Sequence, residues 1–243
     1  MKNNTLDSHT FLLKAKQEAS FFASTDFEKG VISELADWAH LSLNVPNEFF
    51  NNLPPCPFAR QAWTDQKVAV VFDDTNSWQS LYSCVSQFDD SYDMAILVRK
   101  NHLGPPEDLH EYLGAMNEAI SQGFFIDKDI WLMGCHPEDG EAEFVDKNLE
   151  FEEMVEEPYL MVFIQRLSKI QEAAYKLVNK GYYDKYMKDP CSSEQYAKRE
   201  SYYLRLGGTK DERPEKTETS SDATGWFTKT HEERGSHNVR LRA

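Results

Sequence analysis

Three residues of this chain combine reactive side chains with sequence contexts that favour a functional site: Cys56, His136 and Arg166. Cys56 lies between prolines in the segment 54–57, and a short helix is predicted to begin just after it. A thiol at a helix N-terminus is favoured as the thiolate, which suits a nucleophile, a redox thiol or a soft metal ligand. The alternative is a buried cysteine that packs as a small hydrophobe.

His136 comes directly after an apolar run that predicts a strand, and Arg166 follows the end of another such run by two residues. Ligands of α/β proteins often bind at the carboxyl ends of strands, where His136 would serve as a general base, a proton shuttle or a metal ligand. Arg166 would bind a carboxylate or phosphate. The alternatives are a histidine bonded to its own turn and a surface ion pair of small consequence.

The segment from Glu138 to Glu157 holds ten acids and one lysine. With Cys56 and His136, the Glu138 carboxylate is a candidate metal ligand, and Asp139, Glu141 and Glu143 offer further oxygen ligands. The spacing matches neither an EF-hand nor an HExxH helix, and a solvated charged face is the alternative. The sequence has no P-loop and no dinucleotide fingerprint, so it identifies no cofactor.

Acidic residues outnumber basic ones by 41 to 26, and the formal net charge of the 243 residues is −15. Such a charge repels phosphate backbones and anionic lipids, which argues against nucleic acid and membrane surfaces as partners. The four cysteines form no CxxC pair, and no apolar run has the length of a signal peptide or a membrane span. The sequence therefore predicts a cytoplasmic protein with free thiols.

The apolar patterns predict an α+β fold in a single domain over residues 1–206. Strands are expected at 68–72, 92–98, 130–135 and 159–164, and helices at 6–24, 26–43, 58–65, 77–87, 105–121 and 168–180. These strands would form one small mixed or antiparallel sheet, with a permuted ferredoxin-like arrangement as one alternative. Residues 207–243 have the composition of a disordered polar tail, in which Trp226 and Phe227 would be a docking anchor.

The order of several short motifs resembles the bacterial family called domain of unknown function 1415 over about residues 40–185. The resemblance rests on Cys56-Pro57-Phe58-Ala59, on His136-Pro137, and on Pro158-Tyr159 followed by Met161 and Arg166. Acids replace the family's aromatic stretch after His136-Pro137, and Leu160 replaces its proline. The resemblance implies no particular reaction, but it supports Cys56, His136 and Arg166 as a set.

Three functions are compatible with these residues. The first is an enzyme in which Cys56, His136 and Arg166 act on a small anionic substrate. The second is a metal-dependent enzyme or metal carrier with cysteine and histidine ligands. The third is a non-enzymatic interaction module that binds a basic protein through its acidic surface and its tail.

Overall fold

The computed structural model describes residues 25–73, 75, 77–100, 104–125, 128–139 and 159–210. The helix predicted at 6–24, most of the acidic segment, Pro158, and the tail residues Trp226 and Phe227 lie outside these ranges. The described elements, in chain order, are α2 (Asp26–Trp38), η1 (Ala39–Leu43), η2 (Glu48–Phe50), α3 (Ala59–Thr64), β1 (Val68–Phe72), α4 (Gln79–Gln87), β2 (Met94–Arg99), α5 (Pro106–Ser121), β3 (Trp131–Cys135), β4 (Leu160–Gln165), α6 (Leu167–Val178), η5 (Tyr186–Lys188) and α7 (Pro190–Arg205).

The strands form one mixed sheet in the order β1-β2-β4-β3. β1 and β2 are parallel, whereas β4 lies antiparallel between β2 and β3. The α+β class and the mixed sheet predicted from the sequence are confirmed. This topology also fixes direction: β1, β2 and β3 end at one end of the sheet, which we call the carboxyl end, and β4 ends at the opposite end.

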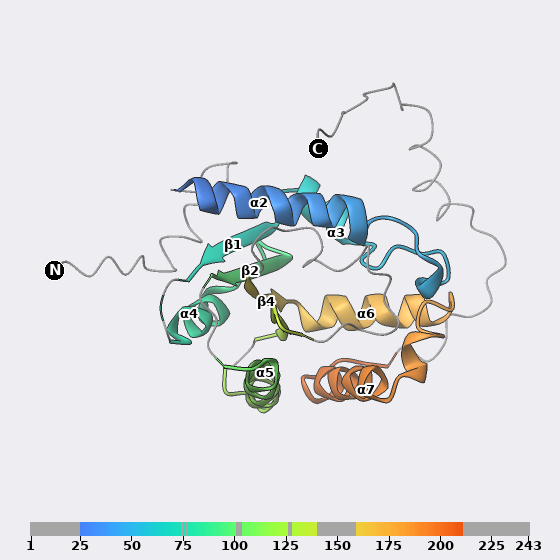
Figure 1. Cartoon of the computed structure of the whole chain (residues 1–243). Helices are drawn as coiled ribbons and strands as arrows, with labels where there is room; N and C mark the ends of the chain where they lie inside the picture. Colours follow the sequence, from blue (N-terminus) through green and yellow to red (C-terminus); the bar gives the residue numbers. More distant parts are fainter. Residues whose placement is uncertain are drawn as a thin grey trace, which may run out of the picture. The chain divides into compact units, whose positions relative to one another are not determined.

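Helices cover both faces of the sheet (Figure 1). Because side chains of a strand alternate between its faces, each strand contributes to two separate cores. α2 and α3 cover one face, where the buried residues are Val31, Leu35, Ala62, Val68, Val70, Ile96, Val98, Tyr159, Met161 and Phe163. α4 and α5 cover the other, where the helices supply Leu81, Cys84, Val85, Leu109, Leu113, Met116 and Ile120. In the described ranges, no helix is both long and apolar enough to cross a membrane.

Two contacts hold α5 close against the edge strand β3. Gly134 leaves room for the helix, because a Cβ built there would lie 2.8 Å from both Leu109 and Leu113 side-chain carbons. Buried Asn117 hydrogen-bonds to both main-chain groups of Leu132, donating to the carbonyl oxygen at 2.9 Å and accepting from N–H at 2.8 Å. These bonds satisfy backbone groups that an edge strand would otherwise leave unpaired, and they fix α5 relative to the end of β3.

Candidate functional site

The three residues singled out by the sequence do not form one site. In the register of β3 and β4, Trp131 pairs with Gln165 and Cys135 pairs with Met161. His136 and Arg166 therefore follow opposite ends of the same ladder, and a rise of about 3.3 Å per residue separates them by about 20 Å along the strands. A shared site would require both strands to end on the same side of the sheet, whereas β3 and β4 run in opposite directions.

Cys56 lies in a third place. The Tyr182 hydroxyl, just beyond the far end of α6, donates to the carbonyl oxygen of Pro55, whereas Arg166 precedes the first residue of that helix. Twelve helical residues span about 18 Å, so Cys56 is far from Arg166. Burial raises the pKa of the Cys56 thiol, although the N–H groups of Phe58 and Ala59 act in the opposite direction. Cys56 precedes Phe58, the N-cap of α3, by two residues, and desolvation outweighs the effect of these N–H groups and disfavours the thiolate.

Three charged or imidazole side chains are buried in the described ranges, and all of them lie at the carboxyl end of the sheet: Asp73, Arg99 and His136. Asp73 follows β1, Arg99 ends β2 and His136 follows β3. Ionisable groups are costly to bury, so their concentration at a single end of the sheet marks a place where function or folding requires them. Carboxyl ends of neighbouring parallel strands are also where α/β sheets bind ligands.

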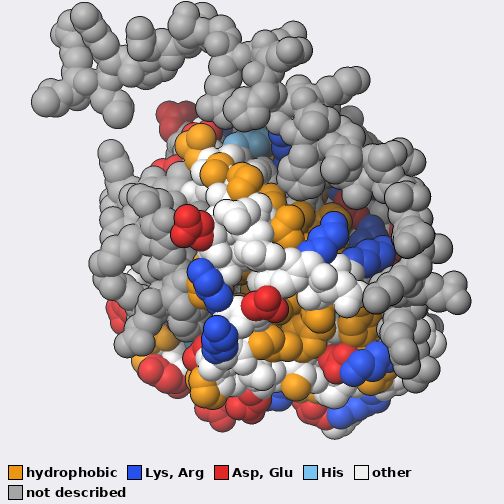
Figure 2. Space-filling model, turned by 90° about the vertical axis from the view of Figure 1, so that its right-hand side faces the viewer, with side chains coloured by type: hydrophobic (Ala, Val, Ile, Leu, Met, Phe, Trp, Pro, Cys, Tyr) orange, Lys and Arg blue, Asp and Glu red, His pale blue; other side chains and the backbone are white. Residues whose placement is uncertain are grey.

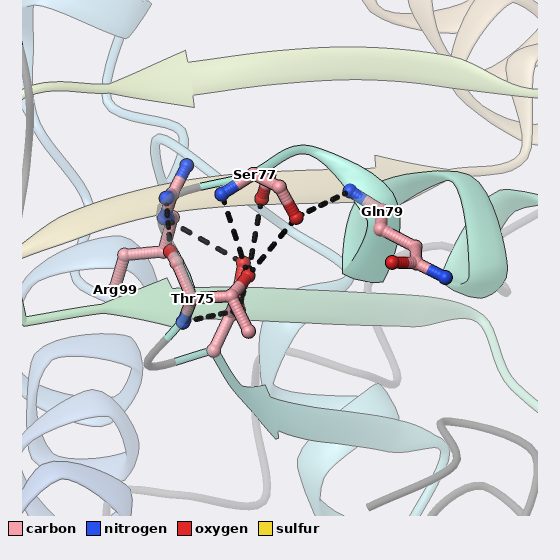
Figure 3. A network of polar contacts seen from close by, with 5 residues as sticks. Thr75, Ser77, Gln79 and Arg99 are labelled. Carbon is pink, nitrogen blue, oxygen red and sulfur yellow. Dashed lines mark hydrogen bonds and ion pairs between the residues drawn. The ribbon is translucent and has the colours of Figure 1, made fainter. Parts of the chain in front are cut away.

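Thr75, Ser77, Gln79 and Arg99 belong to a polar network between β1, β2 and the start of α4 (Figure 3), and Asp73 joins it through its bonds to Thr75. Arg99 Nε lies 3.6 Å from Asp73 Oδ2, and the two side chains are 6% and 0% exposed. Asp73 Oδ1 accepts hydrogen bonds from the Thr75 main-chain N–H at 2.9 Å and hydroxyl at 2.7 Å. The Arg99 guanidinium donates to the Thr75 carbonyl oxygen and lies 4.7 Å from the Trp78 ring centroid. The network links the ends of β1 and β2 through Thr75.

His136 organises the turn that follows β3. Its ring Nδ1 accepts a hydrogen bond from the Glu138 main-chain N–H at 3.1 Å, so Nδ1 is unprotonated and the ring hydrogen is on Nε2. Its main-chain N–H donates to Asp139 Oδ2 at 2.6 Å, and the Asp139 N–H donates back to the His136 carbonyl at 2.9 Å. The ring is buried, so His136 acts on this turn rather than on solvent.

The turn presents Asp139 to a second histidine, His110 of α5. Asp139 Oδ1 lies 2.7 Å from His110 Nε2, and the two side chains are 30% and 46% exposed. This hydrogen bond raises the pKa of His110, with the charges of Asp139 and Glu107 adding to it against partial desolvation. Burial works to raise the pKa of Asp139, but the bonds from His110 and the His136 N–H outweigh it and lower that pKa. The result is a solvent-accessible imidazole oriented by a carboxylate.

The other two sequence-based hypotheses gain no support from the described residues. Among the described residues, no three histidine, cysteine, aspartate or glutamate side chains meet in a group suited to a metal. The face seen in Figure 2 mixes side chains of both charges with apolar ones, so it offers no continuous acidic surface to a basic partner. The tail lies outside the described residues.

Sequence reasoning missed most of this site. Asp73 and Arg99 were detectable, because each follows an apolar strand and the two strands are joined by a helix, which favours parallel pairing and adjacent carboxyl ends. Asp139 was considered only as a metal ligand. Nothing in the sequence around His110 distinguishes it from an ordinary helical histidine, because its partner is 29 residues away.

No protein-family model matches the chain, and neither the curated proteins nor the solved structures include a match to it. The resemblance to domain of unknown function 1415 therefore stays a prediction.

Proposed function

We propose that the carboxyl end of the sheet is the active site of an enzyme that performs acid–base chemistry on a small molecule. The observation that carries this proposal is the contact between Asp139 and His110. A histidine that is hydrogen-bonded to a carboxylate through one nitrogen and open to solvent is the usual arrangement of a general acid or base. His110 replaces His136 as the group that transfers the proton.

Each residue of the pair has a distinct role. In the neutral imidazole, Nε2–H donates to Asp139, which leaves the lone pair of Nδ1 to accept a proton from a substrate. Asp139 orients the ring and stabilises the imidazolium that forms. His136 is a positioning residue, because its main-chain N–H holds the second oxygen of Asp139.

The Asp73–Arg99 network supplies fixed charges and dipoles at the same end of the sheet, with β4 between β2, which Arg99 ends, and β3, which His136 follows. Such preorganised groups stabilise charge that develops in a transition state without reorganising during the reaction. The ion pair is neutral as a whole, so it does not by itself select an anionic substrate. The expectation of an anionic substrate rested on Arg166, which belongs to the other end of the sheet.

The test is a turnover screen with paired variants. Purified protein is assayed against panels of ester, lactone, hydroxy-acid and keto-acid substrates, whose hydrolysis, dehydration or isomerisation requires proton transfer. Any turnover found should fall by about 10²–10⁴-fold in His110→Gln and Asp139→Asn. The matched controls are His40→Gln, at an exposed histidine of η1, and Glu111→Gln, at an exposed acid beside His110 in the sequence. Turnover that survives in His110→Gln contradicts the proposal.

A further inference from the structure

A second site lies at the opposite end of the sheet, where β4 ends. It is a pocket of 440 Å³, within the range of small-molecule sites. Its charged lining comprises three cations and three acids: Lys128, Arg166, Lys169, Asp89, Asp90 and Asp129. The pocket is separate from the acid–base site, because Arg166 and His136 follow opposite ends of the β3–β4 ladder.

Arg166 is the fixed cation of this pocket. Its guanidinium carbon lies 4.7 Å from the ring centroid of buried Phe88, and its side chain is 11% exposed. Its ion-pair partner is Asp90, at 3.1 Å, whose side chain is fully exposed at 103%. Exposed ion pairs contribute about 0–1 kcal/mol, so a ligand carboxylate can replace Asp90 at small cost and gain two parallel hydrogen bonds from the guanidinium.

The neighbouring charges are held by the protein frame. Lys128 Nζ donates to the carbonyl oxygens of Ser86 and Phe88, at 2.8 and 3.1 Å, where α4 ends. These bonds fix the ammonium without neutralising it. Asp129 accepts from the Ser168 main-chain N–H at 2.8 Å and from its hydroxyl, so it is engaged with the start of α6. Asp89 Oδ1 accepts from the Ser91 main-chain N–H at 2.9 Å, and Lys169 is paired with Asp93 at 2.5 Å. Asp89 and Asp90 are the lining carboxylates that are not bound to the start of α6.

We propose that this pocket binds a small zwitterion of the α-amino acid class, with its carboxylate on Arg166 and its ammonium facing Asp89 and Asp90. The lining has no net charge, so an anion or a cation alone meets as many like charges as opposite ones. A molecule that carries both charges is complementary to both halves of the pocket. The proposal requires nothing of the acid–base site and stands independently of it.

The test is titration of the ¹⁵N-labelled full chain with each of the twenty standard L-amino acids up to about 10 mM, a range that detects millimolar binding. At least one should shift the amide signals of Arg166, Ser168 and Lys169. For the best binder, the N-acetyl derivative lacks the ammonium and the amide derivative lacks the carboxylate, and each should bind at least about tenfold more weakly, a difference of 1.4 kcal/mol.

Arg166→Gln should weaken that binding by at least about tenfold, whereas Arg60→Gln, at an exposed arginine of α3, should leave it unchanged. The amide spectrum of each variant reports whether it is folded. Arg166→Lys keeps the charge but loses the bidentate geometry, so it should bind with intermediate affinity. The proposal is overturned if no amino acid shifts these signals, if either derivative binds as well as the parent, or if folded Arg166→Gln binds as well as the original protein.

Discussion

Asp139 joins two elements through one carboxylate: its Oδ1 lies 2.7 Å from Nε2 of His110 on α5, and its Oδ2 accepts from the main-chain N–H that follows β3. The contact exists because Gly134 and Asn117 bring α5 close to β3. It gives the carboxyl end of the sheet an accessible histidine whose proton affinity is set by a carboxylate.

The first prediction concerns the titration of His110. Because the bond to Asp139 raises the pKa of His110, Asp139→Asn should lower it toward its ordinary value of 6.5. Imidazole chemical shifts followed by NMR over a pH series measure the midpoint directly. Glu111→Gln removes the same charge from the adjacent position of α5 and should move the midpoint far less. If the titration midpoint of His110 is the same in the original protein and in Asp139→Asn, the hydrogen bond between Asp139 and His110 is contradicted.

The same pair predicts the pH dependence of stability. A raised folded-state pKa of His110 gives a stabilisation that is complete below 6.5, the unfolded value, and that is lost as pH rises through the folded pKa. The lowered pKa of Asp139 gives a stabilisation that is present above 3.8 and is lost as pH falls through its folded pKa. Both side chains are partly exposed, so the effect should be below about 1 kcal/mol. Urea unfolding of the original protein and of His110→Gln, at a series of pH values from below 3.8 to above 6.5, measures this contribution to the free energy of unfolding.

A third prediction concerns the buried ion pair. Asp73→Asn or Arg99→Met should each destabilise the protein by about 3–5 kcal/mol, because each leaves one buried charge without its partner. The double variant should lose less than the sum of the two. Arg166→Met, whose partner is fully exposed, should cost about 1 kcal/mol or less. Urea unfolding measures the free energy of unfolding of each variant. Equal losses of stability in Arg99→Met and Arg166→Met would show that burial of the partner carboxylate does not decide the cost.

A fourth prediction separates the cysteines by reactivity. Burial raises the pKa of Cys56, and it raises that of Cys84 to about 12, with the charge of Asp73 adding to the effect. Cys191 is exposed at the start of α7. In folded protein at neutral pH, iodoacetamide should modify Cys191 first and Cys56 and Cys84 only slowly, as mass spectrometry of peptides will show. If Cys56 is labelled fastest instead, its thiol is activated, as the sequence analysis predicted.

A fifth prediction tests the support of the site. Gly134→Ala would place a Cβ 2.8 Å from side chains of Leu109 and Leu113, so it should cost about 1–3 kcal/mol by overpacking. Because α5 must then move away from β3, the His110 midpoint should also fall. Gly114→Ala is the matched control, since nothing lies within 4 Å of a Cβ there and alanine favours a helix. An unchanged His110 midpoint in Gly134→Ala would show that the contact does not depend on this packing.

Much of the fold could be predicted from local patterns. The run Val68–Phe72 is a strand with the predicted bounds. Thr25 and Glu28 form a complete capping box at the start of α2, and Gly181 has the positive φ of 71° expected after a helix. α7 was not predicted, although Asp189 caps it and Pro190 begins it. Its apolar face consists largely of tyrosines, which weaken the hydrophobic periodicity.

The candidate site was harder to predict, because it depends on strand direction. The position of Arg166 after a strand was correct, but only the antiparallel placement of β4 shows that it faces away from His136. The pairing of His110 with Asp139 depends on how closely α5 approaches β3, which no periodicity encodes. Local chemistry therefore indicated the candidate residues, and the order and direction of the strands decided which of them meet.

The central claim is that His110, oriented by Asp139, transfers the proton in the reaction of this protein. The most direct measurement is the pH profile of kcat/KM for the first substrate found, in the original protein and in Asp139→Asn. We predict that one limb of the profile has the pKa that NMR gives for His110, and that this limb moves to lower pH in Asp139→Asn together with the NMR midpoint. A limb that stays in place while the NMR midpoint moves would show that another group transfers the proton.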